Sequence, residues 1–233
     1  MMNQQMHRFL DIEAQISQLK MAHDTGGLKQ LFSAFSEEQI PEQLQHWQIY
    51  YRAFILLTLS QLGADSKTHS QQATALLKDA HGIEDKSDEF YTLVACCSGH
   101  LAAATSEPLA KARAGMTSDK SFKISLEINP DNPRTYLLQG LSFMNKPRLV
   151  GGSKKKALML LTKSVELFQS APSATEKVPS WGHLDALYWL SHCHLYFNHF
   201  KEAGQYIDQA LQIDTSFNWG LSLKQKIELK SAS

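Results

Sequence analysis

The sequence is poor in the features that mark disordered, exported and membrane-spanning chains. Glycine and proline account for only 12 and 7 of its 233 residues, too few for a disordered or collagen-like protein. Its apolar runs, such as Ala53–Leu57, are far shorter than the twenty or so residues that span a bilayer. The first twenty residues mix charged and polar residues with apolar ones, without the apolar core of a signal peptide. We therefore expect a cytoplasmic protein with no transmembrane segment.

Neither one sign of charge nor cysteine dominates the composition. Lysine and arginine together number 23, as do aspartate and glutamate, so no net positive field attracts nucleic acid. The three cysteines form an odd set without metal-ligand spacing, and Cys96 and Cys97 are adjacent. A disulfide framework is therefore not predicted. We expect free thiols, no metal, no cofactor and no nucleic-acid partner.

What the chain does contain is helical periodicity along almost its whole length. All seven prolines fall between the periodic segments or in the first turn of one, where proline is compatible with a helix. About three-quarters of the chain is expected to be helical, against about one-third in a typical domain. The expected helices cover residues 9–19, 28–35, 44–62, 70–80, 88–104, 107–128, 133–144, 154–169, 181–197, 200–213 and 218–229.

Particular residues are expected to set three of the helix ends. Asp24–Gly27 should end the first helix, because glycine adopts the left-handed conformation without strain. Ser36 and Gln39 have the spacing of a capping box, in which the two side chains bond to free backbone donors of a helix start. Ser180 is placed to cap the helix that is expected to begin at Trp181.

Large and small residues alternate in a repeating frame within successive helix pairs. In the last pair, large Leu187 and Leu190 precede small Ser191 in the first helix. The second helix then carries a small–large–small ridge of Ala203, Ile207 and Ala210. The preceding pair shows the same frame, with Tyr136, Gly140 and Phe143 in its first helix and Ala157, Leu161 and Ser164 in its second. This pattern resembles the tetratricopeptide repeat (TPR), whose two antiparallel helices pack through such complementarity.

The resemblance covers roughly residues 44–214 and implies an all-α fold. In that fold, antiparallel helix pairs stack as an irregular TPR-like superhelix, or α-α solenoid. The irregularity is expected because the period of about 34 residues is interrupted at 146–152 and at 170–180. The expected organisation is one continuous domain, with an N-terminal helical segment at 1–83, repeats at 84–215 and a capping helix at 216–233.

Three motifs strengthen the resemblance to bacterial TPR proteins of unassigned function. They are Asn129–Gly140, Gly151–Ala157 and Pro179–Gly182. Many members of that set carry export signals. A periplasmic location, with the signal removed, is therefore the alternative to a cytoplasmic one.

Two clusters invite a chemical interpretation that we do not favour. Gly151–Lys154 precedes a helix and could hold a phosphate, but the Walker spacing and its preceding strand are missing, so a turn is favoured. The basic stretch from Lys146 to Lys163 fits a solvated helix face better than an acidic-partner site.

The histidines between positions 192 and 199 do not have the spacing of a metal site. His192 and His194 point about 200° apart on a helix, and His192 and His199 lie about two turns apart unless the chain bends beyond Phe197. We expect ordinary core or surface histidines.

The family resemblance also implies which residues bind a partner, because the first helix of each pair lines the concave face. By repeat position these residues are Glu89, Thr92, Cys96 and His100 in one pair, Arg134, Leu137 and Leu141 in the next, and Asp185, Tyr188, His192 and Tyr196 in the last. Surfaces of this kind bind peptides, helices or protein tails. The sequence thus predicts a protein-interaction scaffold or adaptor that binds a protein or peptide segment in its concave groove.

A small-molecule-binding helical protein is the alternative, with a ligand in the interior between helix 44–62 and the later pairs. An unfilled apolar cavity bounded by Tyr50, Tyr51 and Phe54 would favour it, whereas an open groove would favour the scaffold. An enzyme is not predicted, since the sequence has no G-x-S-x-G, H-E-x-x-H or paired-carboxylate arrangement.

Overall fold

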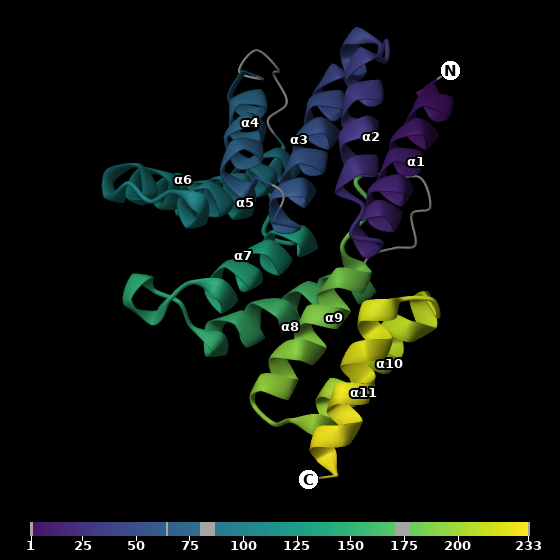
Figure 1. Cartoon of the computed structure of the whole chain (residues 1–233), viewed down its shortest axis with the longest axis vertical. Helices are drawn as coiled ribbons and strands as arrows, with labels where there is room; N and C mark the ends of the chain where they lie inside the picture. The colour runs from purple at the N-terminus through teal and green to yellow at the C-terminus, as the bar shows by residue number, and fades with distance from the viewer. Residues whose placement is uncertain (1, 64, 80–86, 171–177, 233) are drawn as a thin grey trace. The chain divides into compact units, whose positions relative to one another are not determined.

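The computed structural model describes residues 2–63, 65–79, 87–170 and 178–232 (Figure 1). These residues contain no strand, and 83% of them are helical, which confirms the all-α fold. The elements are α1 (Met2–Met21), α2 (Thr25–Glu37), η1 (Glu42–Leu44), α3 (Gln45–Gln61), α4 (Ser66–Asp79), α5 (Asp88–Ala104), α6 (Pro108–Ile128), α7 (Pro133–Asn145), η2 (Arg148–Val150), α8 (Lys154–Ser170), α9 (His183–Tyr196), α10 (Phe200–Ile213) and α11 (Asn218–Ser231). None of the described helices is both long and apolar enough to cross a lipid bilayer.

The chain divides into two compact units. One comprises Met1–Pro130 with Thr175–Ser180, and the other Asp131–Ala174 with Trp181–Ser233. Helices α1–α6 belong to the first unit and α7–α11 to the second. The expected boundary between residues 83 and 84 lies outside the described residues, as does the end of helix 70–80 at Ala80, and the expected domain limits stay predictions.

Helix α3 is the centre of the first unit, where it contacts α1, α2, α4 and α5. Tyr50 and Tyr51 of α3 are buried, and the Tyr51 ring stacks on Phe9 of α1 at 5.5 Å between centroids. The Tyr51 hydroxyl donates a 2.5 Å hydrogen bond to the carboxylate of Glu13, which also accepts a 2.9 Å bond from the backbone N–H of Ser180. Aromatic rings and one satisfied carboxylate therefore fill the space beside α3.

Small residues bring the paired helices close together in the second unit. A Cβ atom added to Gly140 of α7 would lie 3.0 Å from Cγ of Leu161 in α8, so only glycine fits without displacing that side chain. In the next pair, the Ser191 hydroxyl of α9 donates a 2.7 Å bond to the carbonyl of Ala203 in α10. The large–small frame predicted from the sequence is the frame that packs these pairs.

In two helix pairs, a serine of the second helix bonds to the backbone at the start of the first helix. The Ser164 hydroxyl of α8 donates a 2.8 Å bond to the carbonyl of Pro133 at the start of α7. In the first unit, the Ser125 hydroxyl of α6 donates a 2.9 Å bond to the carbonyl of Asp88 at the start of α5. The same contact thus recurs in α5–α6 and α7–α8, as a helical repeat predicts.

The three residue-specific predictions of helix ends are wrong. His23, at φ +54°, takes the left-handed conformation after α1, while Gly26 and Gly27 lie inside α2, whose start is capped by the Asp24 carboxylate accepting from the Gly27 N–H at 2.8 Å. A Cβ on Gly27 would lie 2.5 Å from Cδ2 of Leu19, so this glycine serves a close helix contact.

The capping box and the Ser180 cap fail because both serines bond elsewhere. Ser36 lies in the last turn of α2, and its hydroxyl donates to the carbonyl of Phe32 at 2.6 Å. The Ser180 hydroxyl donates to Glu13. Helix α9 begins at His183, after Gly182 at φ +114°.

The Gly140 contact gives the first testable prediction. Gly140→Leu should lower the free energy of unfolding by about 1–3 kcal/mol, because the added side chain overpacks the Leu161 contact. Chemical denaturation measures the change. Gly204→Leu in α10 is the matched control, since a Cβ there meets nothing within 4 Å and leucine favours the helix. Equal effects at the two glycines would contradict the close-packed frame.

Candidate functional site

Helix α9 separates its residues into a buried face and an open one. Ala186, Leu187, Leu190, Ser191, Cys193 and Leu195 are buried. The predicted binding residues of this helix lie on the other face, where Asp185, Tyr188 and His192 are half-buried and Tyr196 is 53% exposed. Their spacing of three to four residues places them along one line. The open face of α9 is thus a stripe of one acid, two tyrosines and a histidine.

Tyr188 is held within a cluster of aromatic rings. Its ring centroid lies 5.2 Å from that of Trp189 and 5.5 Å from that of Phe217, both edge-to-face, and 6.3 Å from that of Trp219 in α11. Burial, and the negative charge of Asp185 after it, raise the pKa of the Tyr188 phenol, so it remains a neutral donor at physiological pH. The packing fixes this ring in advance of any partner.

His192 extends the cluster by one turn. Its ring lies 6.4 Å from that of Tyr188 and 5.6 Å from that of Trp189. The Nδ1 atom is buried, and the described residues offer it no hydrogen-bond partner. Burial lowers the pKa of His192, and the positive charges of Lys226 and Lys154 lower it further. His192 is therefore neutral at physiological pH.

The chain does bend beyond Phe197, at Asn198 with φ +59°, but this bend brings His194 to His199. Their Nδ1 atoms lie 3.3 Å apart, and the His194 ring stacks on Tyr206. Burial, then the nearby His199, lowers the pKa of His194, while Glu202 opposes the shift. Within the described residues, no group of three His, Cys, Asp or Glu side chains could hold a metal ion.

Arg134 and Leu137 of α7 are used in packing. The Arg134 guanidinium donates a 3.0 Å bond to the carbonyl of Trp181 and lies 5.8 Å from the ring centroids of both Trp181 and Phe168. It therefore ties the start of α7 to the end of α8 and the segment before α9. Leu137 is 1% exposed, and Leu141 is half-buried.

The predicted stripe on α5 is largely covered within the first unit. Glu89 and Cys96 are 8% exposed and Thr92 is 1% exposed, and the Thr92 hydroxyl shares a 2.8 Å hydrogen bond with that of Ser125. Burial raises the pKa of the Cys96 thiol to about 12, so it stays protonated. His100 is half-buried, and burial lowers its pKa. Three of these four residues thus serve the core of the repeat.

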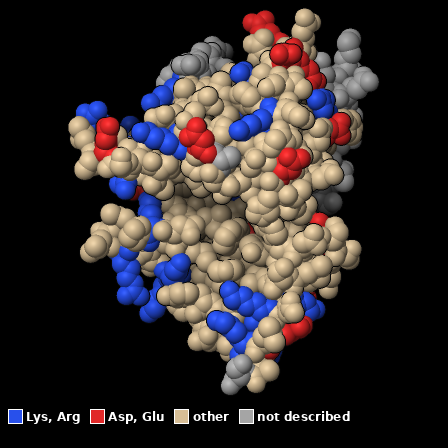
Figure 2. Space-filling model, in the orientation of Figure 1, with Lys and Arg blue, Asp and Glu red and all other residues tan. Residues whose placement is uncertain are grey.

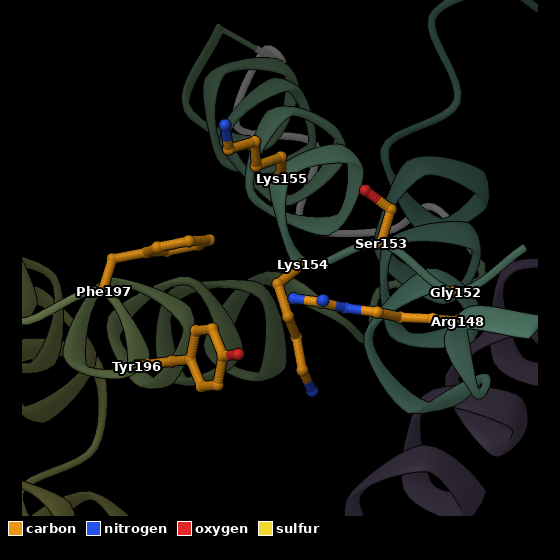
Figure 3. Close-up of a pocket in the computed structure, with 7 residues that line it drawn as sticks. All are labelled: Arg148, Gly152, Ser153, Lys154, Lys155, Tyr196 and Phe197. Carbon is orange, nitrogen blue, oxygen red and sulfur yellow. The ribbon is translucent and has the colours of Figure 1, made fainter.

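A cavity of about 350 Å³ lies next to Tyr196, at the end of α9 (Figure 3). It is lined by Arg148, Gly152, Ser153, Lys154, Lys155, Tyr196 and Phe197. The Lys154 ammonium donates a 2.5 Å bond to the carbonyl of Met144 and lies 5.3 Å from the Tyr196 ring centroid. The basic stretch was visible in the sequence, but its meeting with α9 was not.

Comparisons with known proteins identify the fold. No protein-family model and no curated protein matches the chain. The HusA haemophore from Porphyromonas gingivalis is similar in structure, with a TM-score of 0.62 and 22% identity over 79% of this chain and 92% of that one. A thermophilic TPR protein of Thermus thermophilus has a TM-score of 0.60 and 16% identity over 97% of this chain and 100% of that one. The chain has a TPR-like helical-repeat fold.

The half-buried histidines of the second unit predict how stability depends on pH. His183, His192 and His194 in the second unit have pKa values that burial lowers from 6.5, so the unfolded chain binds protons more readily. The free energy of unfolding should hold above pH 6.5 and fall as the pH drops through 6.5 toward the lowered values. Denaturant unfolding from pH 8 to 5 measures this.

One substitution tests the role of His192 in that dependence. His192→Gln should flatten the loss of stability below pH 6.5, because one half-buried titrating group is removed. His7→Gln on α1 is the control, since His7 is exposed and meets water in the folded and unfolded states alike. An unchanged pH profile for His192→Gln would show that this imidazole does not contribute.

Proposed function

We propose that the chain is a protein-interaction module that binds a segment of another protein on the open face of α9. The observation that carries the proposal is the division of α9 into a buried, mainly apolar face and a partly open stripe of Asp185, Tyr188, His192 and Tyr196. The buried face already secures the fold. The open stripe adds aromatic and hydrogen-bonding groups that the fold covers only in part.

The composition and rigidity of this stripe suit recognition of a peptide. Aromatic side chains supply most of the binding energy at many interfaces, because they bury a large area and lose little conformational freedom. Tyr188 is already fixed against Phe217 and Trp219, so little entropy remains to be lost on binding. The Tyr188 hydroxyl can bond to a partner's backbone and set its direction.

The proposed surface is narrower than the eleven residues that the family resemblance implies. Glu89, Thr92 and Cys96 are buried in the first unit, and Leu137 is buried in the second. Arg134 holds Trp181 and the segment before α9. We assign Arg134 a positioning role. Leu141 and His100 are half-buried, and we do not include them in the proposed binding surface.

A small-molecule ligand is the second candidate. The interior site around Tyr50 and Tyr51 has no support, since these rings are buried and pack on each other and on Phe9. The cavity at the end of α9 supports the candidate instead. A similar structure described as a haemophore gives such binding a precedent in this fold.

A photocrosslinking experiment tests the protein-interaction proposal. A benzoylphenylalanine in place of Tyr196 should form discrete protein adducts in the native cell, because this side chain is exposed at the end of the stripe. The same residue in place of Met159, which is 72% exposed on α8, is the control. Mass spectrometry of the adducts identifies the partner. Identical adducts at both positions, or none at Tyr196, would refute the proposed surface.

The identified partner then allows a quantitative test of Tyr188. Tyr188→Ala should weaken its binding by about 2 kcal/mol or more, roughly thirtyfold, as for central aromatic residues of interfaces. Isothermal titration calorimetry measures the affinity, and far-UV circular dichroism checks that helicity is retained. Met159→Ala should bind as the unaltered chain does. An unchanged affinity for Tyr188→Ala would remove this ring from the contact.

A further inference from the structure

We infer that the cavity at the end of α9 binds a small organic anion with an aromatic body. The anionic group would contact Arg148 and Lys154, and the aromatic part would lie against Tyr196 and Phe197. This inference rests on the second candidate function and names the chemical class of its ligand. It does not depend on the binding of a protein segment to α9.

The charge around the cavity favours an anion. Residues 132–165 contain no aspartate or glutamate, and within the described part of the chain no carboxylate pairs with Arg148, Lys154 or Lys155. Figure 2 shows Lys and Arg side chains gathered over the connection between α7 and α8 and the beginning of α8. The cations that line the cavity are therefore not paired with a carboxylate, and such unpaired positive charge attracts anions.

Arg148 and Lys154 are the two donors assigned to the anionic group, and both line the cavity. In Figure 3 the guanidinium of Arg148 points toward the side of the cavity where Tyr196 and Phe197 lie. Arginine presents a planar fork of donors that matches a carboxylate, a phosphate or a sulfonate. The Lys154 ammonium is held by the Met144 carbonyl at 2.5 Å, so its charge is fixed at the wall before a ligand enters.

Two aromatic rings form the opposite wall. The centroids of Tyr196 and Phe197 lie 5.1 Å apart with the rings perpendicular, so together they form a corner. Tyr196 is 53% exposed and Phe197 is half-buried. An aromatic ligand that covers these rings removes apolar surface from water and can meet them in stacked or edge-to-face contact. The corner thus adds an apolar contact to the charged one.

The size of the cavity fits a small molecule. Its volume of about 350 Å³ is near the lower end of the range for ligand pockets, about 300–1,000 Å³.

Gly152 is part of the wall, and a Cβ added there would lie within bonding distance of the Lys146 carbonyl. Backbone approach at Gly152 therefore fixes how the loop that carries Arg148 returns to α8.

The test uses a pair of probes that differ in charge. The full chain is titrated with 8-anilinonaphthalene-1-sulfonate, an aromatic anion, and with N-phenyl-1-naphthylamine, which lacks the sulfonate, and both are followed by fluorescence. We expect saturable binding of the sulfonate at one site and at least about tenfold weaker binding of the neutral compound, the loss expected for one charge-assisted hydrogen bond. Equal affinity for the two probes would overturn the assignment of an anion site.

Matched variants locate the probe. Arg148→Gln should weaken sulfonate binding about tenfold and leave binding of the neutral probe unchanged. Lys163→Gln removes the same charge from an exposed position on α8 outside the cavity and should have little effect. Tyr196→Ala should weaken binding of both probes. If Arg148→Gln and Lys163→Gln behave alike, the sulfonate is attracted only by net charge, and the site is wrong.

Two further readouts complete the test. The amide NMR signals of Gly152 and Ser153 should shift on addition of the sulfonate and stay in place with Arg148→Gln. Hexaglutamate should displace the sulfonate less effectively than indole-3-acetate does. Tighter competition by hexaglutamate would overturn the small-molecule assignment in favour of an acidic peptide. Crosslinking at Tyr196 reports protein adducts and the titrations report probe binding, so failure of this inference and of the protein-interaction proposal can be told apart.

Discussion

The close approach of paired helices is the constraint on which the rest of each unit depends. Gly140 leaves no room for a side chain beside Leu161, and Ser191 spans the narrow gap between α9 and α10 with a hydrogen bond to the Ala203 carbonyl. A small residue at these positions lets the large side chains of the two helices interlock. The small residues thus determine how much surface the pair buries, although they contribute little of that surface themselves. The hydroxyls of Ser125 and Ser164 extend the constraint to the first turn of the partner helix.

This packing also decides which side chains of α9 stay available for binding. Leu187, Leu190 and Ser191 must face α10 or α8 for the pairs to close, so the opposite side of the helix is turned outward. Asp185, Tyr188, His192 and Tyr196 occupy that outward line. The open stripe is thus a consequence of the buried one, and the rings of Phe217 and Trp219 at the start of α11 hold its centre in place.

Most of the fold follows from local sequence, because periodicity and proline positions reflect burial along one helix at a time. The expected ranges 88–104, 133–144 and 200–213 agree with α5, α7 and α10 to within one residue. The predicted helix ends at Gly27 and Ser36 are wrong because glycine and serine can play several roles near a helix end. Gly27 instead allows a close contact with Leu19, and the Ser36 hydroxyl bonds to the Phe32 carbonyl.

The candidate site was less predictable, because exposure depends on residues distant in sequence. Thr92 is assigned the same repeat position as Tyr188 of the open stripe. It is nevertheless covered, through its contact with Ser125 of α6. To predict the cavity, one would have to know that the segment carrying Arg148 lies beside Tyr196 near the end of α9. The basic stretch at 146–163 was recognised, but a charge pattern alone does not reveal which rings lie beside it.

Tyr196 joins the two proposed binding regions. It is the last residue of the α9 stripe and part of the cavity wall, where the Lys154 ammonium lies 5.3 Å from its ring. An anion that binds Arg148 and covers this ring would remove the ring from a protein segment on α9. Because linkage between two ligands is reciprocal, a segment that buries Tyr196 must weaken anion binding by the same factor. One exposed tyrosine would therefore make a helical-repeat surface respond to a small molecule.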